Sequence, residues 1–363
     1  MSVLIFLLVL FILVLVHEWG HFIVAKKTGM RVDEFGIGFP PKLFGVKKGE
    51  TEYTFNALPI GGFVKIYGEN YEDELVGHID KDPRGFSSRP RWAQALVLVA
   101  GVTMNILFAW LLFSVTYMVG MPTQVDETTA SPQAYVAVVG VMPDSPAADL
   151  PIGAEIVAID LAGSVTYGPT QSDFTEIISG SEGQTVSVTY EYAGEEKILT
   201  MSPSQGLIES DEGRYAVGVS LATIDIVKKS FFVAIKDGLI STVDGLVAIA
   251  VGLYSLVSQA FVGQADFSQV AGPVGIVGMV GDAAEFGLTA LLTFTAIISL
   301  NLAIINLLPF PALDGGRLVF VAVEAVTRRQ IPPEWAGRVN LAGFAILMLL
   351  MIAVTYNDIL RLL

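Results

Sequence analysis

Two histidines and a glutamate lie close together in an otherwise apolar stretch near the start of the chain, which reads His17-Glu18-Trp19-Gly20-His21. In a helix, residues four apart share one face, so the imidazoles of His17 and His21 can grip one metal ion together. Zinc suits two imidazoles and a carboxylate with a fourth position open to water, and Glu18 is placed to take a proton from that water. A polar contact between helices, or a span end that reaches the membrane interface, is the alternative.

A third ligand must come from elsewhere in a chain that has three histidines and no cysteine. His78 lies in a charged loop, and we interpret it as a solvated residue. Asp314 is the better candidate, because it follows Pro309 and Pro311, which forbid a regular helix, and precedes two glycines, which permit a tight turn. Irregular backbone at membrane depth is tolerated only where it is buried in protein or lines a cavity. An aspartate that ends a helix at the interface is the alternative.

The composition indicates what kind of protein carries these residues. Of 363 residues, 53% are apolar and 16% are charged, against roughly a quarter charged in a typical soluble domain. The net charge of −15 argues against a nucleic-acid partner, because phosphate binding needs a basic face. The absence of cysteine excludes a disulfide framework and a cysteine nucleophile. We therefore expect a membrane protein with an acidic, water-soluble part.

Four apolar segments are predicted to cross the bilayer, which needs about 20 residues. They are residues 3–25, which include the histidines, and residues 93–119, 288–308 and 341–354. No basic region precedes the first segment, which argues against a cleaved signal peptide. Residues 226–262 are apolar overall, but their charged residues are spaced as on one side of a helix. An interfacial amphipathic helix is the preferred interpretation there, and a fifth span is the alternative.

The charges of the connecting segments predict an orientation. Residues 26–92 carry 11 Lys or Arg and 10 Asp or Glu, and residues 314–338 carry four arginines. Residues 122–223 carry 2 Lys or Arg and 15 Asp or Glu, a net charge of 2 − 15 = −13. Because positive residues stay on the cytoplasmic side, we expect the first two segments in the cytoplasm and the acidic block outside, with four spans and both termini outside.

The acidic block has the pattern of a small α+β domain. Alternating runs at 135–141 and 185–192 predict strands, and 172–179 predicts a short helix. The block resembles a PDZ domain, chiefly through residues 141–160 (VMPDSPAADLPIGAEIVAID), although Gly153-Ala154-Glu155 stands where that family usually has Gly-Asp. A PDZ domain receives an extended peptide as an added strand. A β-rich spacer that binds nothing is the alternative.

The apolar segments resemble a known family as well. HEWGH in the first span, together with NLLPFPALDGG at 306–316, is similar to the site-2 protease family of intramembrane zinc metalloproteases, in its bacterial regulator-of-sigma-E protease branch. Residues 34–42, 59–66, 100–105 and 272–276 match the same branch, so the resemblance covers nearly the whole chain. We expect one PDZ domain, where some members of this branch have two in tandem.

The resemblance implies roles for individual residues. It implies a zinc ion (Zn2+) held by His17, His21 and Asp314. It implies that Glu18 is the general base, which activates water and later protonates the leaving amine. It also implies that Asn306, in the NLLPFPALDGG motif, helps to hold substrate near the metal.

Three further residues are tentative substrate-binding candidates. Asn105 matches a small polar position near the active site of the family, and a hydrogen bond between packed spans is the alternative. Residues 52–67 predict two short strands around a turn that contains Gly61 and Gly62. In the family the corresponding segment is a membrane-associated β-hairpin near the active site. We expect it to receive unwound substrate as an added strand, and a hairpin that only caps the cavity is the alternative.

Together these features predict a polytopic α-helical membrane protein of about four transmembrane helices, with a membrane-associated β-hairpin and an inserted extracytoplasmic PDZ-like α+β domain. We expect an N-terminal membrane half over residues 1–121 and the PDZ-like domain over 122–206. A post-PDZ amphipathic region should cover 207–287, and a C-terminal membrane half with the LDG motif should cover 288–363.

The expected function is that of an intramembrane zinc metalloendopeptidase, which cuts transmembrane segments of single-span proteins after a first cut by another protease. Anti-sigma-factor-like proteins and signal-peptide remnants are the substrates that the resemblance implies. Expected partners are such a substrate, membrane lipid, and peptide or substrate ends at the PDZ-like domain, with no nucleic acid. The expected location is the bacterial inner membrane, with the active site toward the cytoplasm. A catalytically silent scaffold that binds peptide ends is the alternative, whereas a transporter predicts inverted repeats, which the two halves lack.

Overall fold

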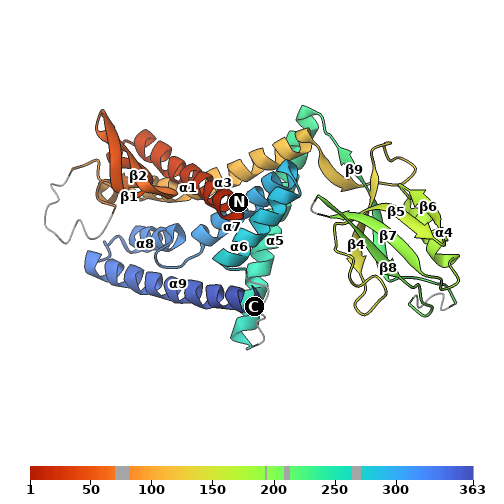
Figure 1. Cartoon of the computed structure of the whole chain (residues 1–363). Helices are drawn as coiled ribbons and strands as arrows, with labels where there is room; N and C mark the ends of the chain where they lie inside the picture. The colour runs from red at the N-terminus through yellow and green to blue at the C-terminus, as the bar shows by residue number, and fades with distance from the viewer. Residues whose placement is uncertain (70–81, 193, 208–212, 264–270, 363) are drawn as a thin grey trace. The chain divides into compact units, whose positions relative to one another are not determined.

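The computed structural model describes residues 1–69, 82–192, 194–207, 213–263 and 271–362 (Figure 1). His78 and its predicted role as a solvated residue lie outside these ranges. The chain forms two compact units. The first combines Met1–Val115 with Phe231–Leu363, and the second is Thr116–Ser230.

Long apolar helices make up most of the first unit. They are α1 (Ser2–Lys27), α3 (Arg91–Val119), α5 (Phe231–Phe261), α7 (Leu288–Leu307) and α9 (Pro333–Leu362), with the shorter helices α6 (Pro273–Glu285) and α8 (Asp314–Thr327) and the 3-10 turn η1 (Phe86–Ser88). Among the described residues, five helices are long and apolar enough to cross a membrane. The membrane fold predicted from the sequence is confirmed, but its count of about four spans rises to five candidates.

The added candidate is α5. It is one continuous helix of 31 residues, and its charged residues all lie in its first half, so that residues 245–261 carry no charge. Trp110 of α3 donates a hydrogen bond from Nε1 to the carbonyl of Ile235 at 2.9 Å, which attaches the start of α5 to α3. An odd number of crossings would place the two chain ends on opposite sides, whereas the predicted four spans place them on the same side.

A small sheet lies against α1 and consists of β1 (Val32–Lys48) and β2 (Thr51–Ile66). Residues 34–37 of β1 pair with residues 62–65 of β2 and also with residues 52–55. The prediction that the two halves of 52–67 pair with each other is therefore wrong, because each half pairs with β1 instead. The predicted strands exist, but their partner strand in residues 32–48 was missed.

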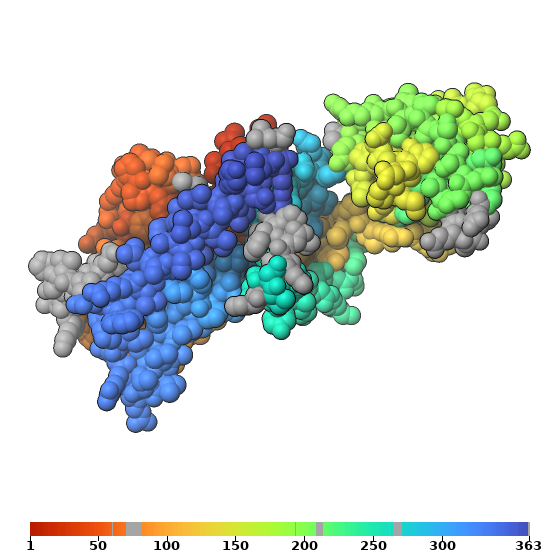
Figure 2. Space-filling view, turned by 90° about the horizontal axis from the view of Figure 1, so that it is seen from below, coloured from red at the N-terminus to blue at the C-terminus, as the bar shows by residue number. Residues whose placement is uncertain are grey.

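Helix α9 runs along the outer face of the first unit (Figure 2). Only 6% of the most apolar 18-residue stretch of this helix is buried. Among the contacts of the described residues, two polar ones bear on how it is attached to the rest of the unit. The Asp358 carboxylate accepts hydrogen bonds from two backbone N–H groups at the start of α6, at 2.8 and 3.0 Å. The Asn340 side chain accepts from the backbone N–H of Ala312 at 3.2 Å. The second contact bears on the site, because Ala312 precedes Asp314 by two residues.

The second unit is built on one antiparallel sheet with the strand order β3-β9-β4-β5-β7-β8, in which β6 pairs with β5. The strands are β3 (Met121–Gln124), β4 (Tyr135–Val141), β5 (Glu155–Leu161), β6 (Ser164–Tyr167), β7 (Val186–Tyr192), β8 (Glu195–Met201) and β9 (Val219–Val227), and the helix is α4 (Gln171–Ser179). The strands predicted at 135–141 and 185–192 and the helix predicted at 172–179 are confirmed, as is the PDZ-like α+β class.

Apolar residues of the sheet and of α4 form the core of this unit, among them Val138, Ile159, Phe174 and Val188, each at most 3% exposed. A capping box begins α4. The Thr170 hydroxyl accepts from the Asp173 N–H at 3.1 Å, and the Asp173 carboxylate accepts from the Thr170 N–H at 3.0 Å.

The unit extends further along the chain than the sequence suggested. Strand β9 pairs with both β3 and β4, so it belongs to the sheet. The compact unit therefore runs to Ser230, and the predicted boundary at residue 206 is too early.

Candidate active site

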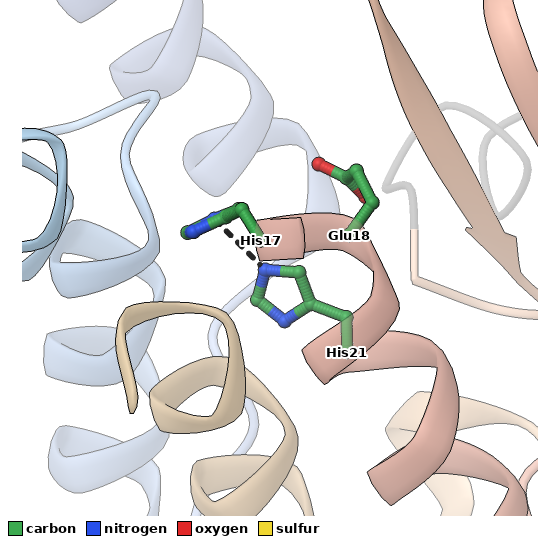
Figure 3. A group of neighbouring side chains, drawn as sticks. All are labelled: His17, Glu18 and His21. Carbon is green, nitrogen blue, oxygen red and sulfur yellow. Dashed lines mark hydrogen bonds between the residues drawn. The ribbon is translucent and has the colours of Figure 1, made fainter. Parts of the chain in front are cut away.

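His17 and His21 project from one face of α1 and meet each other, while Glu18 leaves the helix at the neighbouring position (Figure 3). The two Nε2 atoms are 3.1 Å apart. Both imidazoles are nearly buried, at 6% and 8% exposed. The four-residue spacing thus brings the two rings together as expected for a helix.

Asp314 joins the histidines from 297 positions further along the chain. Its Oδ2 lies 3.0 Å from His17 Nε2 and 3.3 Å from His21 Nε2. The three atoms therefore form a triangle with sides of 3.0, 3.1 and 3.3 Å. Ligands bound tetrahedrally to zinc at its usual bond lengths are separated by about 3.3 Å. Two imidazoles and a carboxylate are also a donor set that zinc favours, so these residues fit a zinc ion.

The loop between α7 and α8 places Asp314 at the first position of α8. The loop packs tightly on the two glycines that follow. A Cβ atom on Gly315 would lie 2.2 Å from the carbonyl oxygen of Leu308, and one on Gly316 would lie 2.2 Å from that of Phe310. Only glycine permits this approach, which explains why the aspartate is followed by two of them.

Helix α3 supports the histidines with three residues spaced four apart. The Nδ1 of His21 donates to the carbonyl oxygen of Val97 at 2.8 Å, which leaves its Nε2 with the lone pair that a metal ligand needs. At Gly101, one turn later, a Cβ atom would lie only 2.4 Å from His21 Nε2. Asn105, another turn later, has its Nδ2 3.3 Å from His17 Nδ1.

Glu18 is half-buried beside the triangle, and a backbone group fixes its position. Its Oε2 accepts a hydrogen bond from the N–H of Val64 at 3.0 Å. Val64 lies in the part of β2 that pairs with β1. The carboxylate is therefore held at the edge of the small sheet.

A cavity of about 410 Å3 opens in front of these groups. It is lined by Glu18, His21 and Asp314, by residues 63–66 of β2, and by Glu69 and Arg317, which form an ion pair. This volume is in the range of ligand pockets. Two proposed metal ligands, a carboxylate and a sheet edge thus share one space.

The tentative substrate-binding residues are not among the residues that line this cavity. Gly61 and Gly62 are buried in β2, directly before the lining residues 63–66. Asn306 is half-buried in the last turn of α7. Asn105 is completely buried behind His17.

Sequence reasoning missed three contributors to the site. Val97 and Val64 act through backbone atoms, which leave no mark in a sequence. Gly101 did leave a signal, because Val97, Gly101 and Asn105 follow at intervals of four and so share one helix face.

Comparisons with known proteins identify the family to which the chain belongs. The family described as Peptidase family M50 matches residues 5–350. A putative zinc metalloprotease of Clostridium perfringens is 38% identical and covers 96% of this chain and 95% of its own length. The zinc metalloprotease RasP of Oceanobacillus iheyensis is 30% identical, with 99% of both chains covered. The regulator of sigma-W protease RasP of Bacillus subtilis is 29% identical, again with 99% of both covered.

Solved structures of PDZ domains match a part of the chain. One of them is the PDZ domain of an SdrC-like protein from Listeria innocua, which is 22% identical over 24% of this chain and 92% of that chain, with a TM-score of 0.21.

Proposed function

The chain belongs to Peptidase family M50, and from that premise we propose that it cuts peptide bonds within transmembrane segments of single-span proteins. It is a zinc metalloprotease with membrane-spanning helices. The observation that carries the proposal is that His17, His21 and Asp314 meet one another, and that His21 and Asp314 line a cavity together with Glu18.

In the proposed mechanism, His17, His21 and Asp314 hold the zinc ion. When bound, zinc lowers the pKa of water and polarises the scissile carbonyl. Glu18 takes the proton of the attacking water and returns it to the leaving nitrogen. The Val64 N–H donates a hydrogen bond to Oε2 of Glu18, which leaves Oε1 to accept the proton of the attacking water. Asn306 is proposed to hold substrate near the metal.

A helical substrate must unwind before its carbonyl can be attacked, and we propose that the edge of β2 receives the unwound segment. The Val64 N–H points to Glu18 and so away from β1. Backbone N–H and C=O groups alternate in direction along a strand. The backbone groups of Gly62 and Ile66 therefore point to the same side of β2 as those of Val64. Substrate paired there would lie beside Glu18. A sheet that only closes the cavity is the alternative.

The second unit is proposed to select substrates through their extracytoplasmic ends, after another protease has trimmed them. A cavity of about 720 Å3 lies between α4 and β9 and is lined by apolar residues that include Phe174, Ile178, Val219 and Leu221. Strand β3 pairs with residues 224–227 of β9, and the N–H of Val125 donates to the carbonyl of Thr223, so within the described residues the edge of 219–222 stays open to an added peptide strand.

The proposed location of the protein rests on the distribution of charge. The net charge of 2 − 15 = −13 over residues 122–223 and the positive charges of 314–338 support an extracytoplasmic second unit and an active site toward the cytoplasm of a bacterial inner membrane. Anti-sigma-factor-like proteins and signal-peptide remnants are the proposed substrates. A silent scaffold that only binds peptide ends has no need of the four polar groups in apolar surroundings.

The test uses the purified full chain in detergent with a single-span substrate, and mass spectrometry maps the products. We expect a cut inside the transmembrane segment with the wild-type protein and none with Glu18→Gln. A cut confined to the segments outside the membrane would overturn the proposal. Binding of substrate without any cut would favour the scaffold.

A further inference from the structure

The side chain of Asn105, next to the proposed metal ligand His17, uses only one of its two polar atoms in a hydrogen bond. Its side chain is completely buried, and its Oδ1 has no hydrogen-bond partner among the described residues. Its Nδ2 lies 3.3 Å from His17 Nδ1. The backbone is held firmly, because the Ser299 hydroxyl of α7 donates to the Asn105 carbonyl at 2.8 Å. Unpaired polar atoms of this kind cost roughly 1–3 kcal/mol and call for an explanation.

The orientation of this amide decides which nitrogen of His17 carries the proton. If the Asn105 N–H donates to Nδ1, the proton of the neutral imidazole must sit on Nε2. Nε2 is the atom that faces His21 and Asp314. A protonated Nε2 has no lone pair for a metal ion, so this arrangement is incompatible with zinc binding by His17.

The opposite orientation removes the conflict. The two ends of a carboxamide have nearly the same size and shape, so the group can take either orientation in the same space. Asn105 Oδ1 accepts no hydrogen bond from any described residue. Turning the carboxamide by 180° therefore breaks no hydrogen bond made by Oδ1. Either orientation makes one hydrogen bond with His17, but only acceptance through Oδ1 leaves Nε2 free.

We propose that Asn105 is a positioning residue for the metal site, whose Oδ1 accepts a hydrogen bond from His17 Nδ1–H and thereby holds His17 in the tautomer that binds zinc. This inference rests on the proposed zinc site. It also makes the two histidines equivalent, because His21 Nδ1 already donates to the Val97 carbonyl. One face of α3 then orients both ligands, with Gly101 between the two contacts.

Two substitutions of similar size separate an accepting role from a donating one. Asn105→Asp keeps the acceptor oxygen, whereas Asn105→Leu removes it. Zinc affinity is measured on the purified full chain by competition with a chelator, and cleavage is a second readout. We expect Asn105→Asp to bind zinc at least as tightly as wild type and Asn105→Leu to bind it about 10–100-fold more weakly. Equal weakening by both variants would mean that the amide donates, and would overturn the inference.

Controls separate this inference from folding and from the proposed function. Asn301→Leu is the matched variant, because Asn301 bonds only to Ile297 of its own helix among the described contacts, at 3.0 Å, and it should keep wild-type affinity. Thermal unfolding without zinc checks that each variant folds. If Asn105→Asp does not fold, Asn105→Thr should bind zinc more tightly than Asn105→Val, and equal affinities would count against the inference. A wild-type protein without zinc affinity would instead refute the proposed site itself.

Discussion

His17 Nε2 and Asp314 Oδ2 lie 3.0 Å apart although 297 residues separate them in the chain. The contact joins α1, at the start of the chain, to α8, near its end. Each half of the membrane unit therefore supplies part of the proposed metal site, and neither half holds it alone. We expect substitutions that change how the helices pack to lower the zinc affinity before they affect other properties of the protein.

Gly101→Ala tests whether α3 must pass this close to the histidines. Its new Cβ atom would lie 2.4 Å from His21 Nε2 and 2.7 Å from His17 Cε1. Overpacking of this kind costs about 1–3 kcal/mol, so we expect zinc affinity to fall about tenfold or more. Gly278→Ala is the matched control, because it lies in α6 with no atom near its Cβ position, and it should bind zinc normally. Normal zinc binding by Gly101→Ala would refute the close packing.

Gly61→Val tests the role of the sheet edge. Gly61 has a φ of +140°, which a β-branched residue adopts only with strain, and its Cβ would lie 3.1 Å from Val14 Cγ1. We expect zinc content to stay unchanged while cleavage falls about tenfold, because residues 62–66 shift at the cavity wall. Ala57→Val, at an exposed position of the same strand, serves as the control. Unchanged turnover by Gly61→Val would eliminate the sheet edge as a substrate site.

Removal of the second unit tests its proposed role in substrate selection. Gln124 and Ile224 are partners in the β3–β9 register, so residues 125–223 can be replaced by a short flexible linker. We expect this variant to cut a short, trimmed substrate at the wild-type rate and to gain cleavage of the untrimmed form. Gel assays of both substrates measure this. Loss of cleavage of the short substrate would contradict a role limited to selection.

The capping box of α4 predicts a pH dependence. The hydrogen bonds of Asp173 with the Thr170 hydroxyl and backbone N–H lower its pKa below the usual value. Stability from a depressed carboxyl pKa is present above the unfolded value of about 3.9 and is lost as pH falls through the folded value. Asp173→Asn should therefore speed hydrogen exchange in α4 roughly twofold at pH 6, since a charge at a helix start is worth about 0.5 kcal/mol.

The same comparison at pH 3 completes the test, because wild type and variant at one pH share their intrinsic exchange rates. The difference between them should shrink there, since the stabilisation that comes from the ionised carboxyl declines once the pH lies below the unfolded pKa of about 3.9. A difference that grows at pH 3 would contradict the assigned sign.

The sequence pointed to the centre of the site but not to its supports. His17, Glu18 and His21 could be found because helical spacing alone places them together. Asp314 could be found because prolines and glycines mark an irregular segment in an apolar region. Val97 and Val64 could not be found, because their contribution is a backbone atom whose position depends on how α3 and β2 pack against α1.

The fold was predicted to a similar degree. The strands and helix of the second unit follow from alternation and local signals, and 135–141 is matched residue for residue. Strand β1 was missed, because residues 34–37 pair on both sides with parts of β2 and thus lack the one-sided alternation of an edge strand. Helix α5 was assigned to the interface, because its charged first half hides the uncharged segment at 245–261.

The most direct test of the central claim is the zinc content of the purified wild-type protein, Glu18→Gln and Asp314→Ala, each measured beside cleavage of a single-span substrate. We predict about one zinc per chain in the wild type and in Glu18→Gln, with cleavage only in the wild type. Asp314→Ala should lose both the metal and the activity. A metal-free wild-type protein that still cleaves, or an Asp314→Ala variant that keeps its full zinc content, would contradict the account.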